Sequence, residues 1–250
     1  MAVGARPPDI RLWLLHVMRS ANGNRSAGSV PPVSETIEPR YGARYTRGLQ
    51  MAAELHATQS RKGTQIPYVS HLLHVSALVW EGGGNEDAAI AALLHDAIED
   101  QGRGGATRDA IAAEIGDVVV GIVEDCSDAE SDVGAATAKA PWGARKEAHL
   151  AHLSDHSDQT LLVVLADKLH NATSMLGDLV GGGVSVEVFW KRFNAEPEGS
   201  IWYFHRIHGV LDQRGIGGPL LGRFDAVIDA LSSRAGVDRA TARPIAKKDR

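Results

Sequence analysis

The stretch from Ala88 to Asp100, AAIAALLHDAIED, most constrains what this chain can fold into. Its first seven residues are apolar, and a helix that is apolar on every side is a buried helix. Four ionisable residues follow them: His95, Asp96, Glu99 and Asp100. On a continuous helix these four side chains fall within an arc of about 140°. Because burying such groups is costly unless they are paired or bind a metal, the stretch predicts a buried metal or acid–base site. The alternative is a helix end that carries ordinary surface charges.

The other segments predict an all-α fold. Apolar residues recur at helical spacing between breaks rich in Gly and Pro, and no series of segments alternates as strands do. The expected helices cover residues 45–59, 68–80, 88–100, 107–115, 117–126, 142–153, 161–176, 189–193, 201–211 and 220–231. The run LLVVLA at residues 161–166 also fits a strand. Its pattern continues to Leu176, however, and as a helix it places four polar residues on one face: Asp167, His170, Asn171 and Ser174.

The chain divides into one domain and two polar ends. With 250 residues and 44% hydrophobic content it can bury a sizeable core, expected over residues 41–233. Residues 1–40 contain a stretch rich in Gly, Ser and Pro, which is typical of a disordered extension. This segment is also rich in Arg and poor in acids, so a transit peptide is an alternative, and a start codon assigned too far upstream is another. Residues 234–250 form a polar, basic tail.

Charge and cysteine content exclude several classes of protein. The formal net charge of −5 gives no overall basic field, which argues against nucleic acid or a membrane surface as a partner. Any anionic ligand must be held by local charges. No apolar run is long enough to span a bilayer. Cys126 is the single cysteine, which excludes disulfides and cysteine metal sites and favours a reducing, cytoplasmic location. The oligomeric state is left open.

Histidine and aspartate residues on three separate helices are candidate metal ligands. They are His71, His95, Asp96 and Asp167. A helical bundle builds an internal site in this way, from side chains on facing helices. A mixed set of imidazoles and carboxylates suits Mn²⁺, Fe²⁺ or Zn²⁺ better than a metal that prefers thiolates. Asp167 directly follows a buried apolar run, where a carboxylate needs a partner.

Other polar residues are candidates for catalysis and for substrate binding. Glu99 and Asp100 can take a proton from a water that a metal has acidified. Arg61 and Lys62 lie in a basic turn, and their side chains can bind phosphate or stack on a base. Asn171 lies one helical turn beyond Asp167 and can bond a ribose hydroxyl.

Three segments together resemble a known hydrolase domain. The series HATQSRKGTQIPYVSH, AALLHDAIED and LADKLHN is similar to the HD-superfamily domain of RelA/SpoT-type proteins, in the same order from about Tyr45 to Met175. Those enzymes remove the 3′-diphosphate of the alarmone (p)ppGpp. The resemblance implies an HD-type helical bundle and Mn²⁺ as the metal. Because the chain ends too soon for the synthetase and regulatory domains, it resembles a stand-alone small alarmone hydrolase.

The resemblance also assigns roles to individual residues. The metal ligands fall on His71, His95, Asp96 and Asp167, and the catalytic acidic pair falls on Glu99 and Asp100. The substrate-binding residues fall on Arg61, Lys62, Tyr68 and Asn171. The products are then GDP or GTP and pyrophosphate.

Three departures from the family pattern lie beside the expected substrate pocket. The turn after Lys62 reads GTQIP where the long enzymes have SGEP, Leu72 replaces a usual proline, and Gln101 replaces a threonine. Two alternatives therefore stay open. One is an enzyme acting on another phosphorylated nucleotide, such as the 2′-phosphate of NADPH, and the other is a non-catalytic nucleotide-binding domain.

Overall fold

The structure is a computed structural model that describes residues 41–102, 105–127, 141–181, 183, 185–193 and 195–244. The predicted disordered extension of residues 1–40 lies outside the described residues. Arg40–Arg250 form one compact unit. Its described elements are the helices α2 (Ala43–Leu55), α3 (Val69–Glu81), α4 (Glu86–Leu94), α5 (Ala97–Gln101), α6 (Ala106–Glu114), α7 (Asp117–Cys126), α8 (Trp142–Leu153), α9 (Asp158–Val180), α10 (Val186–Trp190), α11 (Pro197–Gln213) and α12 (Pro219–Ala235). The described residues include no strand, which confirms the all-α prediction.

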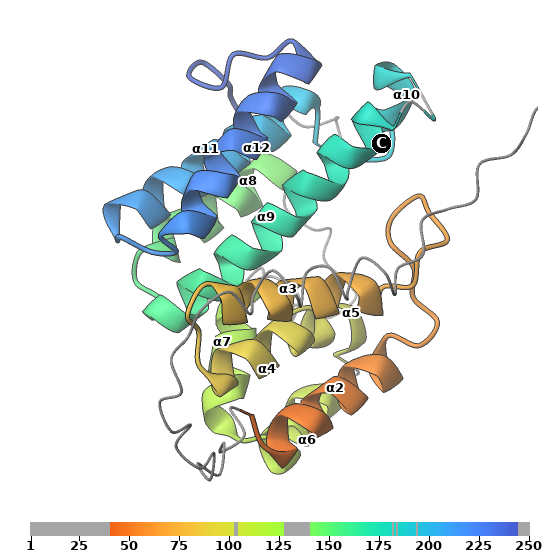
Figure 1. The fold of residues 1–250 in the computed structure, drawn as a ribbon, viewed down its shortest axis with the longest axis vertical. Helices are drawn as coiled ribbons and strands as arrows, with labels where there is room; N and C mark the ends of the chain where they lie inside the picture. Colours follow the sequence, from red (N-terminus) through yellow and green to blue (C-terminus); the bar gives the residue numbers. More distant parts are fainter. Residues whose placement is uncertain are drawn as a thin grey trace, which may run out of the picture. The chain divides into compact units, whose positions relative to one another are not determined.

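Helix α9 is the central element of this unit. It contacts α3, α4 and α7 as well as α11 and α12, and Figure 1 shows it running between these two groups of helices. Its N-terminus is capped by Ser157, whose hydroxyl accepts a hydrogen bond of 3.1 Å from the backbone N–H of Thr160. Leu161–Ala166 are all buried within it. The ambiguous LLVVLA run is therefore helix, as its continuation predicted.

Helix α4 is the buried helix that the sequence predicts. Residues 88–94 are fully inaccessible to solvent. Asn85 caps the N-terminus by accepting a 2.9 Å hydrogen bond from the N–H of Ala88, and two acidic residues of the first turn favour the helix dipole.

The prediction of one continuous helix to Asp100 is wrong, because α4 ends at Leu94 and α5 begins at Ala97. The ring of His95 bonds the carbonyl of Ala92 at 2.9 Å, and a continuous helix would offer that carbonyl to the backbone N–H of Asp96. The imidazole of His95 thus takes the Ala92 carbonyl that the backbone of a continuous helix would use, and the helix is interrupted there. The break places His95 and Asp96 at a turn between two helices.

Several other boundaries differ from the sequence-based expectation: α9, α11 and α12 are longer at both ends than expected, and α10 begins and ends three residues earlier. The first helix ends at Leu55, before the expected Gln59. The carbonyl of Gln59 instead accepts a 2.9 Å hydrogen bond from the N–H of Tyr68, which closes the loop of residues 60–67. An isolated antiparallel bridge between Ser60 and Pro67 lies at the same place. At the other end, α12 extends to Ala235, two residues into the predicted tail.

None of the helices in the described part of the chain is long and apolar enough to cross a membrane.

Candidate metal centre and adjoining pocket

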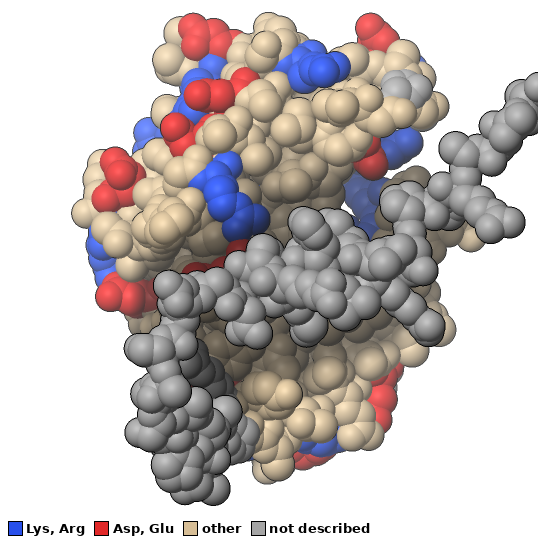
Figure 2. All heavy atoms as spheres, viewed as in Figure 1, with Lys and Arg blue, Asp and Glu red and all other residues tan. Residues whose placement is uncertain are grey.

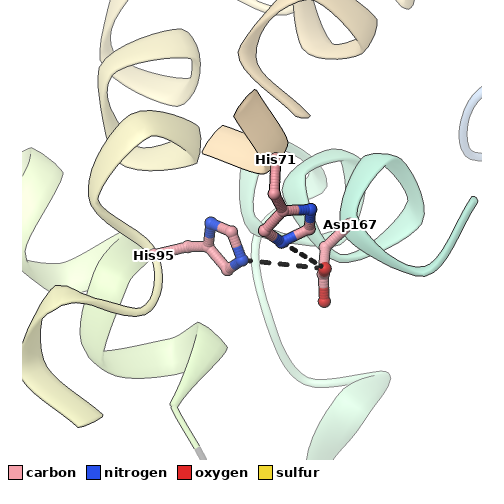
Figure 3. Close-up of side chains that lie close together, drawn as sticks. All are labelled: His71, His95 and Asp167. Carbon is pink, nitrogen blue, oxygen red and sulfur yellow. Dashed lines mark ion pairs between the residues drawn. The ribbon is translucent and has the colours of Figure 1, made fainter. Parts of the chain in front are cut away.

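Three buried side chains from three different segments meet at one point. His71 comes from α3, His95 from the turn after α4, and Asp167 from the middle of α9 (Figure 3). Oδ1 of Asp167 lies 3.2 Å from Nε2 of His71 and 3.7 Å from Nε2 of His95. One ligand atom from each residue lies within 4.8 Å of the others, a spacing that fits a single metal ion.

Asp96 completes this group from the side of the turn. Its Oδ2 lies 2.9 Å from Nε2 of His95 and 3.8 Å from Nε2 of His71. Tyr68 fixes the carboxylate by donating its hydroxyl proton to the same oxygen. The structure therefore brings together all four ligands that the sequence predicts. Two imidazole nitrogens and two carboxylates are an N/O donor set for a divalent transition metal.

The hydrogen bonding of His95 fits a metal ligand. Its Nδ1 lies 2.9 Å from the carbonyl of Ala92, which can only accept, so Nδ1 carries a proton. Its Nε2 is buried and has no hydrogen-bond partner among the described residues, although a carboxylate lies 2.9 Å away. A buried ring nitrogen without a hydrogen bond needs an explanation, and a cation beside the two carboxylates provides one.

The electrostatics of the group favour a cation. Burial opposes the charge on Asp167, but Lys168, His71 and His95 outweigh it, and the pKa of Asp167 lies well below its usual range. Burial likewise opposes the charge on His95, yet Asp96 and Asp167 raise the pKa of that imidazole well above its usual range. The two carboxylates thus favour positive charge beside Nε2 of His95, which a bound divalent metal would supply.

His71 is neutral in this setting, because burial lowers the pKa of its imidazole. Its second ring nitrogen, Nδ1, lies 2.7 Å from Nδ1 of His170. The sequence predicts that His170 lies on the same helix face as Asp167 but assigns it no function. Its place in the sequence LHN, on the same helix face as Asp167, is the feature of the sequence that indicates where His170 lies.

Two adjoining cavities lie beside this centre, and candidate metal ligands line only the smaller of the two. The smaller, of about 100 Å³, is lined by His95, Asp96 and Asp167 together with Glu99, His149, Lys146 and Lys168. The larger, of about 680 Å³, is lined by Arg61, Lys62, Tyr68, Asn171, Lys146 and Lys168, among others. Both lysines line both cavities, so the two spaces adjoin. The larger volume falls in the range of pockets that bind small molecules.

The predicted substrate-binding residues gather along the larger cavity. Arg61 donates from Nη2 to Oδ1 of Asn171 at 2.8 Å, and its guanidinium lies 5.8 Å from the centre of the Tyr68 ring. Lys62 places its ammonium 5.9 Å from the centre of the Phe193 ring. These contacts place the planar guanidinium of Arg61 and two aromatic rings at the wall of the cavity, where a nucleobase can stack.

The structure separates the two predicted catalytic acids. Both side chains are exposed, but only Glu99 lines the small cavity beside the metal ligands. Asp100 lines neither of the two cavities, and its Oδ2 accepts a 2.7 Å hydrogen bond from Gln59. Glu99 and Asp100 are successive residues of α5, so their side chains point about 100° apart and meet different surroundings.

Sequence reasoning also missed residues that line the cavities. Lys146 and His149 come from α8, where the sequence showed only a charged, amphipathic helix. Tyr203 comes from α11 and lies under both lysines, with its ring centre 5.0 Å from Nζ of Lys146 and 6.0 Å from Nζ of Lys168. No spacing pattern in the sequence marks these residues, because they meet the site only through the packing of α8 and α11.

On the face drawn in Figure 2, Lys and Arg side chains of the described residues are interspersed with Asp and Glu. The positive charge that matters for a phosphate is the set lining the two cavities.

Fold and site together define a helical domain with a buried histidine–carboxylate centre. A family model described as HD domain matches residues 48–179, more than half of the chain. The chain therefore belongs to the HD domain family. This assignment implies a divalent metal, and the group of His71, His95 and Asp167 fits one.

The chain is similar to several curated proteins. It is 32% identical over 132 residues to the Drosophila melanogaster guanosine-3′,5′-bis(diphosphate) 3′-pyrophosphohydrolase MESH1, covering 52% of this chain and 68% of that one. For the zebrafish (Danio rerio) MESH1 the identity is 32% over 126 residues, covering 49% and 64%. For a probable GTP pyrophosphokinase of Mycobacterium leprae it is 30% over 129 residues, covering 52% and 15%. The chain thus spans less than two thirds of the zebrafish and mycobacterial proteins.

Two solved structures share this fold. One is described as a metazoan orthologue of SpoT that hydrolyses ppGpp and plays a role in starvation responses; it is 28% identical with a TM-score of 0.55, covering 77% of this chain and 96% of that one. The other is a Listeria monocytogenes protein that is 25% identical with a TM-score of 0.52, covering 66% and 99%. The HD-type helical bundle that the sequence predicts is confirmed.

Proposed function

We propose that this protein is a metal-dependent hydrolase that removes the 3′-diphosphate of (p)ppGpp. The observation that carries the proposal is the buried group of His71, His95 and Asp167, of which His95 and Asp167 line a cavity that two lysines also line. A phosphate placed in that cavity would contact metal and cations together. The likeness to pyrophosphohydrolases of this alarmone, and to a solved structure described as hydrolysing ppGpp, supports the choice of substrate.

Four residues would hold the metal: His71, His95, Asp96 and Asp167. When bound, a divalent metal supplies Lewis acidity, which withdraws charge from phosphate oxygens and makes water more acidic. The donor set is compatible with Mn²⁺, Fe²⁺ or Zn²⁺, and we propose Mn²⁺, which the resemblance to RelA/SpoT-type enzymes implies. We further propose a cytoplasmic protein whose partner is a small nucleotide rather than nucleic acid or a membrane.

The reaction needs a base near the attacked phosphorus. Glu99 lines the small cavity with the ligands, and its carboxylate would take a proton from the attacking water. The water oxygen bonds to the phosphorus that carries the 3′ oxygen, and the bond from that phosphorus to the 3′ oxygen breaks. The 3′ oxygen keeps the electron pair and gains a proton, so GDP or GTP and pyrophosphate leave. Lys146 and Lys168 would balance the phosphate charge.

The nucleoside would occupy the larger cavity. Arg61 and Tyr68 present a guanidinium and a ring that can stack on the base, and Asn171 offers its amide to the ribose. Lys62 would add charge at the outer wall. Asp100 would support its neighbour Glu99, and its own carboxylate accepts a hydrogen bond from Gln59.

The test is release of pyrophosphate and GDP from ppGpp by the purified full chain with Mn²⁺. Asp167→Asn is the matched variant, because it keeps the size of the side chain and removes the charge between the two histidines. We expect turnover by the wild type, and loss of both Mn²⁺ binding and turnover in the variant. NADPH is the comparison substrate, and slow release of its 2′-phosphate is expected.

Two results would contradict the proposal. Faster turnover of NADPH than of ppGpp would keep the metal site and replace the substrate. Tight binding of ppGpp with metal bound, but with no turnover, would identify a nucleotide-binding domain that is not an enzyme.

A further inference from the structure

A hydrogen bond between two histidine rings joins the metal centre to the larger cavity. Nδ1 of His71 lies 2.7 Å from Nδ1 of His170, and the ring centres are 4.9 Å apart. His71 is almost completely buried on α3, whereas His170 comes from α9 and lines the larger cavity. The contact therefore spans the two helices that carry His71 and Asp167.

One of the two nitrogens must donate and the other must accept. A neutral imidazole has one N–H and one lone pair, and only the nitrogen with the lone pair can bind a metal. Nε2 of His71 faces Asp167 at 3.2 Å and Asp96 at 3.8 Å, so it is the nitrogen that faces the centre. When Nε2 binds a metal, the proton of His71 must be on Nδ1, and Nδ1 needs an acceptor.

His170 can accept this proton because its Nδ1 lies within hydrogen-bond distance of His71 Nδ1 and a neutral imidazole has a lone pair on one ring nitrogen. With its Nδ1 accepting, its own proton lies on Nε2. A cationic His170 would have no lone pair to offer.

The other ligand histidine shows the same arrangement with a different acceptor. Nδ1 of His95 bonds the backbone carbonyl of Ala92, which fixes the tautomer in which Nε2 has the lone pair. Histidines that bind metals usually donate their second N–H to a carboxylate, a carbonyl or water. Among the described residues, the one hydrogen-bond partner of His71 Nδ1 is His170.

We propose that His170 is a positioning residue for the metal, whose Nδ1 accepts the ring proton of His71 and so fixes the tautomer in which His71 Nε2 is the ligand. The inference rests on the metal site of the proposed function. It adds a fifth residue to the site, one that does not bind the metal but fixes the tautomer of a ligand. Because α9 carries both Asp167 and His170, the same helix supplies a ligand and orients another.

The variants His170→Asn and His170→Leu test the inference in the full chain. The Oδ1 of Asn is bonded to Cγ, as Nδ1 is in His, so His170→Asn keeps an acceptor near the same place, whereas His170→Leu removes it. We expect Mn²⁺ affinity, measured by competition with a chelator, to fall about 10- to 100-fold in His170→Leu. We expect His170→Asn to restore most of that affinity.

His74→Asn is the control for Mn²⁺ affinity. His74 lies one turn from His71 on α3, and its ring centre is 4.7 Å from that of His170, but its Nδ1 bonds the carbonyl of Ser70. Replacing it should leave Mn²⁺ affinity unchanged. Urea unfolding of each protein without metal would identify a variant that fails to fold.

A measurement on the wild type needs no variant. With Zn²⁺ as a diamagnetic probe, ¹⁵N NMR of the histidine rings should show a protonated Nδ1 on His71 and an unprotonated Nδ1 on His170. The reverse assignment, or wild-type affinity in folded His170→Leu, would overturn the inference alone. A wild type that binds neither Mn²⁺ nor Zn²⁺ would overturn both the inference and the proposed function.

Discussion

Arg61 donates a 2.8 Å hydrogen bond to Asn171, a residue 110 positions further along the chain. Asn171 in turn donates from its other amide atom to Oδ1 of Asp167, at 2.5 Å. One amide thus joins the loop at residues 60–67 to a candidate metal ligand. Because Asn171 bonds both groups, a change there should affect nucleotide binding and metal binding together, whereas a change at Arg61 should affect nucleotide binding alone.

Arg61→Ala should raise KM for ppGpp by about 10- to 100-fold, the range for loss of a hydrogen bond to a charged group. Mn²⁺ affinity should stay near the wild-type value, because among the described residues the side chain of Arg61 hydrogen-bonds Asn171 and not a candidate metal ligand. Steady-state kinetics at saturating Mn²⁺, together with chelator competition, measure the two effects separately. Asn171→Ala is the comparison and should weaken both. If Arg61→Ala and Asn171→Ala lost the same Mn²⁺ affinity, the prediction that Arg61 affects nucleotide binding alone would be wrong.

Glu99→Gln should lower kcat by about 10²- to 10⁴-fold, the usual contribution of a general base. Glu99 lines the small cavity with the ligands, and Gln keeps its size without its basicity. Asp100→Asn should have a much smaller effect, because an amide oxygen can still accept the hydrogen bond from Gln59. Single-turnover rates at saturating ppGpp are the measurement. Equal losses of kcat in the two variants would show that the acids act as a pair, as the family resemblance implies.

Much of this site could be predicted from the sequence because its ligands follow strong local signals. His95 and Asp96 end a wholly buried apolar run, and Asp167 follows another. The break between α4 and α5 could not be predicted, since it depends on the ring of His95 bonding the backbone of Ala92. Nor could the contributions of Lys146 and His170, which reach the site through packing between helices distant in the sequence.

Tyr68→Phe should weaken Mn²⁺ binding while leaving KM for ppGpp nearly unchanged. The sequence placed Tyr68 among the substrate-binding residues, but in the structure its hydroxyl donates to Asp96, and burial with the nearby carboxylates raises the pKa of the phenol, which keeps it protonated. Phe keeps the ring beside Arg61 and removes this hydrogen bond. We expect a loss of metal affinity of a few fold to tenfold, as for removal of one neutral donor. A large increase in KM with unchanged metal affinity would instead assign the hydroxyl to the substrate.

Arg239→Ala should destabilise the domain by about 1 kcal/mol at neutral pH, a typical value for partly exposed ion pairs. Arg239 lies in the predicted polar tail, yet it folds back on α12, where Nη2 lies 2.8 Å from Asp225 and Nη1 pairs with Asp229.

The pH dependence of this destabilisation follows from the pKa of Asp225, which the hydrogen bond from Arg239 lowers below its usual value. Since the folded-state pKa lies below the unfolded value of about 3.9, the stabilisation is fully present above that pH and is lost as the pH falls through the folded pKa. His205 acts in the same direction, because burial and Arg239 lower its pKa too. The difference in urea unfolding free energy between wild type and Arg239→Ala should therefore be largest near pH 7 and shrink toward pH 3. A difference that is constant with pH would mean that Arg239 stabilises the domain by packing alone, and one that grows as the pH falls would contradict the ion pair.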